Sequence, residues 1–174
     1  RVCRDGKIEL VVGTMSSGQG HETSYAQVVS DWLGVPFDSV RFIANDTDRV
    51  TVGGGSHSGR SMRLVSIAIG EAVKDLIDKG KAVVANMLST SELTITYEDS
   101  YFWGPNNQRL SLLDVAEAMV SSNSRPTGQQ ADFEGIGDIT NRVGGYPYGA
   151  HACEVEVDPE TGVVEIVSWS GVDD

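Results

Sequence analysis

Two glycine-bearing loops, each leading into a helix, constrain the fold of this 174-residue chain more than any other feature of its sequence. The first reads Gly13-Thr-Met-Ser-Ser-Gly-Gln-Gly20 and follows a short β-branched run that is typical of a strand. The second reads Gly53-Gly-Gly-Ser-His-Ser-Gly-Arg-Ser61 and stands at the entrance to a long amphipathic segment. Because the first turn of a helix offers unpaired N–H donors, both loops suit an anion or a polar ring system.

The side chains of the loops extend this interpretation. The amide of Gln19, between two glycines, can donate and accept hydrogen bonds at once. Arg60 stands among Ser56, Ser58 and Ser61, and a guanidinium with hydroxyls beside a helix N-terminus indicates a phosphate site. Plain turns have the same composition, so both interpretations stay open at this point. Neither loop carries a P-loop or a G-x-G-x-x-G motif, so a phosphate-bearing ligand would be bound in another way.

Composition and charge exclude several classes of protein. The net charge of −12, with 13 basic residues against 25 acidic ones, argues against nucleic acid as a partner. No apolar run is long enough to span a membrane and no export signal is visible, so we expect a cytoplasmic protein. Cys3 and Cys153 are too few for a disulfide framework, and His21 is not part of an H-E-x-x-H motif. We therefore expect no metal ligand from protein side chains.

Hydrophobic periodicity predicts three helices and six strands. The helices are expected at residues 22–33, 64–88 and 110–120. The strands are expected at residues 8–13, 39–44, 93–97, 101–103, 148–157 and 163–169. The last two strands flank the turn Asp158-Pro-Glu-Thr-Gly162 and predict a hairpin. The mixture indicates an α+β fold, with helices packed on one face of a mixed β-sheet, in one domain or two intimate lobes.

Further local signals refine this arrangement. We expect residues 8–13 to pair with a preceding strand that lies mostly outside this sequence, Gly80 to mark a break or wobble in the second helix, and Ser111 to cap the third helix with Asp114. No element is assigned to residues 121–137. The chain starts without Met and stops abruptly, so we expect it to be a piece of a longer protein.

Several motifs, in this order along the chain, resemble one known family. They are Gly18-Gln-Gly-His-Glu-Thr23, Tyr25-Ala-Gln27, Leu33-Gly-Val-Pro36, Asn45-Asp-Thr-Asp48, Gly59-Arg-Ser61, Tyr146-Pro-Tyr-Gly-Ala-His151 and Glu154-Val-Glu-Val-Asp-Pro-Glu-Thr-Gly162. Together they resemble the molybdopterin-binding large subunit of the xanthine dehydrogenase, aldehyde oxidase and carbon monoxide dehydrogenase family. The resemblance covers nearly the whole chain. It implies that residues 1–174 are a single fragment of a larger molybdenum-cofactor-binding domain, from the C-terminal half of the large subunit.

The resemblance implies a molybdenum–pterin cofactor, in its cytosine dinucleotide form, held without a direct side-chain ligand to the metal. Carried over by position, the implied cofactor-binding residues are Ser17, Gly18, Gln19 and Gly20 in the first loop and Ser58, Gly59, Arg60 and Ser61 in the second. His21 and Glu22 are expected to cap and pack the first helix. The family's catalytic glutamate follows a Gly-x-Gly motif; Glu134-Gly-Ile-Gly-Asp138 has the glycines but ends in Asp, so no catalytic residue is assigned.

The function implied is that of a molybdenum hydroxylase, which oxidises an aldehyde, an N-heterocycle or carbon monoxide with water as the oxygen source. Its implied partners are iron–sulfur and FAD subunits or domains, the remainder of the molybdenum subunit and a small-molecule substrate. The fragment is expected to be inactive alone. Two alternatives stay open: a free-standing binding module for a phosphorylated cofactor, and an oligomerisation domain in which Gln19 and Arg60 are dispensable.

Overall fold

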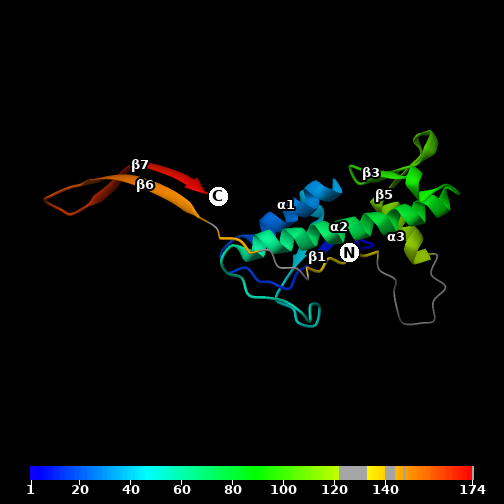
Figure 1. Ribbon diagram of the computed structural model, residues 1–174, viewed down its shortest axis with the longest axis horizontal. Coiled ribbons are helices and arrows are strands. Elements are labelled where there is room, and N and C mark those ends of the chain that lie inside the picture. The colour runs from blue at the N-terminus through cyan, green and yellow to red at the C-terminus, as the bar shows by residue number, and fades with distance from the viewer. Residues whose placement is uncertain (122–132, 140–143, 147, 174) are drawn as a thin grey trace. The chain divides into compact units, whose positions relative to one another are not determined.

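The computed structural model describes residues 1–121, 133–139, 144–146 and 148–173 (Figure 1). The chain divides into two compact units, Arg1–Arg142 and Val143–Asp174. Each unit is described by itself.

The first unit begins with a parallel pair of strands joined by a helix. Strand β1 (Ile8–Val11) pairs in parallel with β2 (Val40–Ile43), with Ile8 opposite Val40. Helix α1 (His21–Leu33) and the 3-10 turn η1 (Phe37–Ser39) form the crossover, as a parallel pair requires. The expected pairing of residues 8–13 with a strand that precedes them is confirmed for the part of it that this chain contains, because Val2 and Ile8 form an antiparallel bridge and Glu9 N donates to the carbonyl of Arg1 at 2.8 Å. The parallel pairing with β2 was not predicted, because the periodicity of β1 does not indicate which strands lie beside it.

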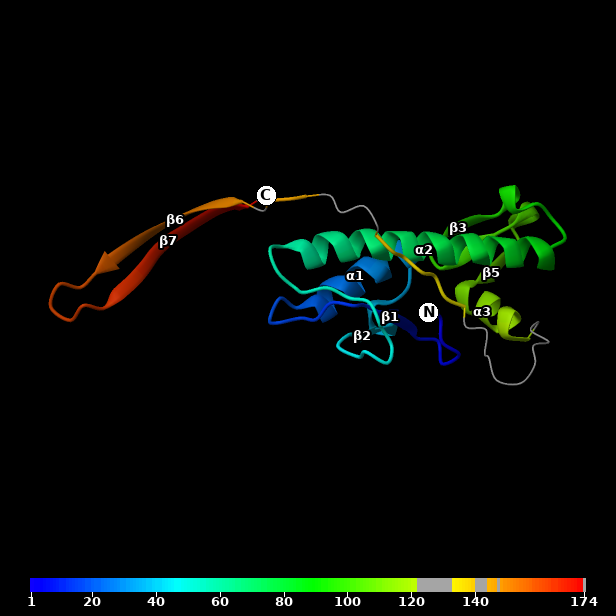
Figure 2. The same cartoon turned by 60° about the horizontal axis from the view of Figure 1, so that its bottom comes forward.

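Helix α2 (Arg60–Met87) runs through the first unit as a single helix of 28 residues (Figure 2). It packs against α1, and the predicted break at Gly80 does not occur. A Cβ atom at Gly80 would lie 2.7 Å from Cε1 of Phe102, whose side chain is fully buried. Gly80 therefore serves close packing of an aromatic ring on the helix.

Three short strands and a third helix complete this unit. Strands β3 (Thr96–Glu98), β4 (Tyr101–Trp103) and β5 (Arg109–Ser111) form an antiparallel sheet in the order β3-β4-β5. The 3-10 turns η2 (Glu92–Thr94) and η3 (Pro105–Asn107) precede β3 and β5, and α3 (Leu112–Ser121) follows the last strand. The predicted hairpin is confirmed in β3 and β4, although its first strand starts at Thr96 and not at residue 93. Arg109–Ser111, where we expected the third helix to start, is a strand.

The predicted cap of α3 is confirmed as a reciprocal pair. The Ser111 hydroxyl accepts a hydrogen bond from Asp114 N at 3.1 Å, and Asp114 Oδ2 accepts one from Ser111 N at 2.8 Å. Most of residues 121–137, left without an assignment, lie outside the described residues. The described part that follows this gap, residues 133–137, begins at Phe133. Phe133 is buried and forms a β-bridge with Val2.

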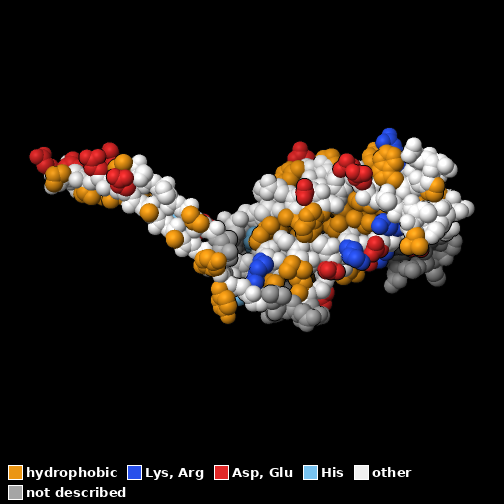
Figure 3. Space-filling view, turned by 45° about the horizontal axis from the view of Figure 1, so that its top comes forward, with side chains coloured by type: hydrophobic (Ala, Val, Ile, Leu, Met, Phe, Trp, Pro, Cys, Tyr) orange, Lys and Arg blue, Asp and Glu red, His pale blue; other side chains and the backbone are white. Residues whose placement is uncertain are grey.

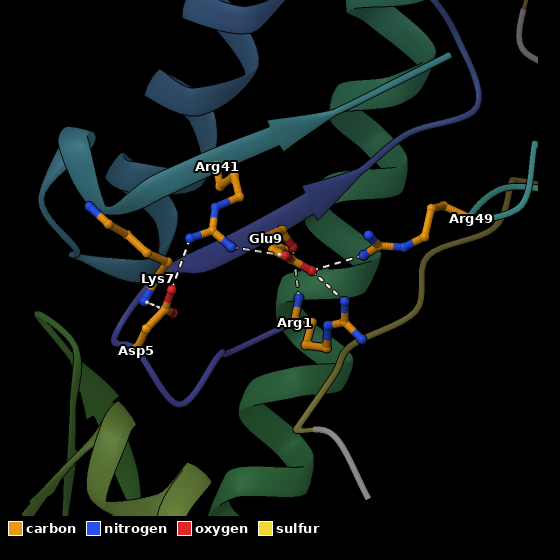
Figure 4. A network of polar contacts seen from close by, with 6 residues as sticks. All are labelled: Arg1, Asp5, Lys7, Glu9, Arg41 and Arg49. Carbon is orange, nitrogen blue, oxygen red and sulfur yellow. Dashed lines mark hydrogen bonds and ion pairs between the residues drawn. The ribbon is translucent and has the colours of Figure 1, made fainter. Parts of the chain in front are cut away.

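A buried carboxylate fixes β1 beside its neighbours (Figure 4). Glu9, 9% exposed, accepts hydrogen bonds from the guanidinium groups of Arg1, Arg41 at 3.1 Å and Arg49 at 2.9 Å. The Arg1 side chain contributes most to holding the pKa of Glu9 at about 2, against its usual 4.5, while burial opposes the shift. Because Arg41 lies on β2 and Arg49 follows it, the network ties β1 to the segment that leads into the second loop.

The second unit is a long antiparallel hairpin, as predicted. Strand β6 (Gly149–Val157) pairs with β7 (Val164–Asp173), and Gly162, with φ of 74°, completes the turn between them. The Asp158 carboxylate accepts hydrogen bonds from the backbone N–H groups of Glu160 and Thr161, which stabilises this turn.

The architecture confirms an α+β fold containing parallel and antiparallel strands, which in the described residues belong to three separate sheets. The core of the first unit joins side chains from β1, α1, α2, β4 and α3, among them Tyr25, Val84, Phe102 and Val115. Among the helices of the described residues, none is long and apolar enough to cross a membrane.

Candidate functional site

The two glycine loops lie side by side in the first unit. The N–H of Gly54 donates to the carbonyl of Gly13 at 2.8 Å. A Cβ atom at Gly13 would lie 2.5 Å from the carbonyl oxygen of Val52 and 2.7 Å from Cα of Gly53. The close approach of the two backbones at this point requires glycine, and it brings together loops that are about forty residues apart in the sequence.

Gln19 joins the tips of the two loops. Its Nε2 donates to the Ser56 hydroxyl at 2.7 Å, and its Oε1 accepts from Ser17 N at 2.5 Å. The amide that we expected to contact a ligand therefore also holds the first loop in shape against the second. Ser56 is not among the residues implied by the resemblance, although its hydroxyl beside Arg60 in the second loop had marked it as a candidate contact.

A buried pair of hydroxyls lies beneath these contacts. Ser61 Oγ is 3.1 Å from Thr14 Oγ1 and donates to Ser56 Oγ at 2.9 Å. Ser61 is 4% exposed and Thr14 is 6% exposed. The structure therefore gives Ser61 a role in fixing the loops, and sequence reasoning missed Thr14 because nothing in its pattern marks it as a contact between loops.

Both helices begin without a side-chain cap. The residues before their first turns, Gly20 and Gly59, have φ of 71° and 64°, and neither helix receives a side-chain hydrogen bond at its N-cap. Ser58, with φ of 51°, adds a second left-handed residue just before α2. Uncapped N–H groups at the positive end of a helix dipole attract an anion, so each loop presents a helix terminus with the electrostatics of an anion site.

Arg60 adds a fixed positive charge at the start of α2. Its Nη1 donates to the carbonyl of Gly55 at 2.6 Å, which holds the guanidinium against its own loop. A guanidinium has five N–H donors, so this bond leaves others for a ligand. The loop of Gly18 and Gly20 is open, since a Cβ at either position would meet no atom of the described residues within 4 Å. The site thus combines accessible backbone with a positioned cation.

His21 packs inside the unit, as expected. It is 4% exposed, and its ring stacks on Tyr25 with centroids 4.8 Å apart. Burial raises the pKa of Tyr25 to about 12. Within the described residues, His21 Nδ1 and the Tyr25 hydroxyl have no hydrogen-bond partner. Glu22 is exposed in the first turn of α1, where its charge favours the helix dipole.

The glycines of residues 134–138 have a packing role. The segment lies along α2: a Cβ at Gly135 would collide with the carbonyl oxygen of Ala72, and one at Gly137 with that of Ala68. Between them, Ile136 N donates to Asp75 Oδ2 at 2.9 Å. The alternation of glycines therefore lets an extended chain lie directly on a helix.

A cleft of about 500 Å³ lies between β1, α2 and residues 134–137 and extends to Gly13. Most of its lining side chains are aliphatic, and the Glu9 carboxylate within it is paired with arginines. The cleft therefore offers mainly apolar contacts, in contrast to the polar loops. No group of three or more His, Cys, Asp or Glu in the described part of the chain could hold a metal ion.

Comparison with known proteins identifies the family of the chain. The family described as molybdopterin cofactor-binding domain matches residues 1–174. The chain is 33% identical to the nicotine 6-hydroxylase large subunit of Paenarthrobacter nicotinovorans, covering 97% of this chain and 21% of that protein. It is 30% identical to the carbon monoxide dehydrogenase large chain of Afipia carboxidovorans, covering 100% of this chain and 22% of that protein.

Solved structures show the same fold. The crystal structure of the Cu,Mo-CO dehydrogenase matches 99% of this chain and 22% of its own chain, with a TM-score of 0.81 and 27% identity. Quinoline 2-oxidoreductase from Pseudomonas putida 86 matches with a TM-score of 0.72 and 26% identity. The chain thus spans about a fifth of the length of these relatives. It belongs to the molybdopterin cofactor-binding domain family of the molybdenum hydroxylases.

Proposed function

We propose that the two loops form part of the cradle for a molybdenum–pterin cofactor and contact its phosphate groups. The observation that carries this proposal is the joining of two uncapped helix N-termini by the Gln19–Ser56 hydrogen bond of 2.7 Å. Two helix termini and the Arg60 guanidinium supply positive potential for more than one phosphate group. This supports the cytosine dinucleotide form, whose pyrophosphate carries two phosphates.

The residues of the site fit such a group. The proposed contacts are the backbone of Gly18, Gly20 and Gly59, the hydroxyls of Ser17, Ser58 and Ser61, the amide of Gln19 and the guanidinium of Arg60. Ser61 is buried and holds the loops, so its contribution is chiefly to position the others. When bound, the cofactor supplies the molybdenum centre for substrate oxidation, and this chain's residues bind and orient it.

The parent enzyme is proposed to be a molybdenum hydroxylase that oxidises an aldehyde, an N-heterocycle or carbon monoxide with water as the oxygen source. Residues 1–174 are one fragment of its cofactor-binding domain, inactive alone. The proposed partners are the remainder of the molybdenum subunit and iron–sulfur and FAD subunits or domains. A cytoplasmic location stays a prediction. Turnover by the isolated chain would contradict the proposed inactivity of the fragment.

Two variants of Ser58 in the full-length subunit test the cradle. Asn and Asp have the same shape and both tolerate positive φ, so they differ only in charge. A carboxylate near a helix N-terminus favours the helix but repels a phosphate group. We therefore expect Ser58→Asp to bind several-fold less molybdenum per subunit than Ser58→Asn, while its melting temperature in the cofactor-free state is no lower than that of Ser58→Asn.

A second pair of variants isolates the guanidinium. Arg60→Gln should lower molybdenum and acid-released cytidine nucleotide together, whereas Arg63→Gln, one turn further along α2, should retain both. Equal molybdenum in the two Ser58 variants and in the two arginine variants would contradict the proposal. It would favour the alternative in which the loops serve only structure or assembly. If Arg60→Gln lowers molybdenum but the unmodified subunit releases no cytidine nucleotide, the cradle is supported and only the dinucleotide form of the cofactor is contradicted.

A further inference from the structure

The hairpin of β6 and β7 has one apolar face and one polar face. Side chains of a strand alternate, and partners directly opposite share a face. The residue pairs Cys153–Trp169, Val155–Ile166 and Val157–Val164 therefore lie on one side. The other side carries Glu154, Glu156, Glu165, Ser168 and Ser170, with the smaller apolar set Ala150, Ala152 and Val172 near the open end of the hairpin. Figure 3 shows apolar atoms along one side of the hairpin and carboxylates along the other near its tip.

A β-bulge keeps the apolar face continuous. Ile166 and Trp169 are three positions apart, so strict alternation would place them on opposite faces. The pairing shifts between Glu154 and Val155, which leaves Val167 without a partner and brings Trp169 back to the side of Ile166. The register of the hairpin is therefore arranged so that a large aromatic side chain joins the aliphatic ones.

The position of the indole is fixed by polar contacts at its edge. Trp169 Nε1 donates to His151 Nδ1 at 3.2 Å, and His151 Nε2 lies 3.0 Å from Asp173 Oδ1. Yet Trp169 is 62% exposed and Ile166 is 63% exposed. An ordered aromatic ring beside exposed aliphatic side chains is typical of a surface that another surface covers.

The stability of a hairpin leads to the same conclusion. Two strands alone are marginally stable in water and need a third strand or a packed face. Taken by itself, the second unit leaves exposed all residues of β6 and β7 whose burial is described. The hairpin is nonetheless part of a match that covers 99% of this chain and 22% of the Cu,Mo-CO dehydrogenase chain, so about four-fifths of that chain lies outside the match.

We infer that the apolar face of the hairpin, formed by Cys153, Val155, Val157, Val164, Ile166 and Trp169, docks onto an apolar surface of the same subunit outside residues 1–174. The carboxylates of the opposite face keep that side in water. A covalently linked surface is present at high effective concentration, which favours it over a second copy. The inference shares with the proposed function only the requirement for a longer subunit.

Cys153 provides the test, because this exposed thiol lies within the apolar face. Its alkylation rate with iodoacetamide is measured by mass spectrometry of its own peptide, in the 174-residue chain and in the full-length subunit. Ser170→Cys places a control thiol on the polar face of the same hairpin. Comparing the ratio of the two rates between the samples removes the intrinsic reactivity of each thiol.

We expect similar rates for both thiols in the 174-residue chain, and a fall of about tenfold or more for Cys153 alone in the full-length subunit. Equal rates in the full-length subunit would overturn the inference. Protection of Cys153 already in the 174-residue chain would also overturn the inference. If dilution removes that protection, the covering surface belongs to a second copy of the chain. If the protection persists on dilution, the covering surface belongs to residues 1–142. Molybdenum content, measured on the same subunit, distinguishes the two proposals. A protected Cys153 in a subunit that binds no molybdenum would contradict the proposed cofactor cradle but not the docking of the hairpin.

Discussion

Replacing Glu9 by Gln removes the charge at the centre of the arginine network while preserving its shape. The side chain of Arg1, then those of Arg49 and Arg41, hold the pKa of Glu9 at about 2 instead of 4.5. At about 1.4 kcal/mol per pKa unit, this difference corresponds to roughly 3 kcal/mol of stability. The three arginines are 29%, 35% and 46% exposed, so solvent screening reduces the effect. We expect Glu9→Gln to lower the free energy of unfolding at pH 7 by between about 1 and 3 kcal/mol.

The pH dependence gives this prediction a second readout. The pKa of Glu9 is lower in the folded state, so between about pH 2 and 4.5 the unfolded state binds more protons. Stability from this group is therefore fully present above about pH 4.5 and is lost as the pH falls through about 2. The difference between the wild-type chain and Glu9→Gln should shrink across this window.

Urea unfolding followed by circular dichroism, at pH 7 and at steps down to pH 3, measures both quantities. Asp5→Asn is the matched control, because Asp5 also pairs with Arg41, at 2.9 Å, but is exposed. It should leave the unfolding midpoint nearly unchanged. If Glu9→Gln unfolds at the same urea concentration as the wild-type chain at pH 7, the reasoning is refuted. A difference that stays constant down to pH 3 would refute it as well, since it would reflect lost packing and not lost charge.

Three further substitutions test packing and capping in the first unit. Gly80→Ala should gain about 1 kcal/mol of helix propensity but lose about 1 to 3 kcal/mol by crowding Phe102, so its urea midpoint should fall; a rise would show that the ring moves aside freely. Ser111→Ala removes the cap shared with Asp114 and should cost about 1 kcal/mol, measured as faster hydrogen exchange in the first turn of α3. Gly135→Ala should lower the free energy of unfolding by about 1 to 3 kcal/mol, because its methyl group would meet the backbone of α2; exchange of the Ile136 amide should accelerate with it.

Local signals in the sequence determined most of the elements. The apolar spacing of residues 22–33 predicted α1, the Ser111–Asp114 pair predicted the cap of α3, and the turn at residues 158–162 predicted the hairpin. The ordered set of motifs was specific enough to indicate the family that residues 1–174 match. Such signals depend on neighbours within a few positions, so they are present in the sequence itself.

Tertiary structure alone decided how these elements meet. The parallel pairing of β1 with β2, the bond from Gln19 to Ser56 and the contact of Gly80 with Phe102 each join residues more than twenty positions apart. In the sequence, a glycine that breaks a helix cannot be distinguished from one that makes room for an aromatic ring. The alternation of apolar and polar residues in β7 likewise does not reveal the bulge at Val167. Which residue or strand lies opposite another depends on the packing of the whole unit. For that reason the sequence pattern predicted the loops and the helices, but not the contacts that hold them together.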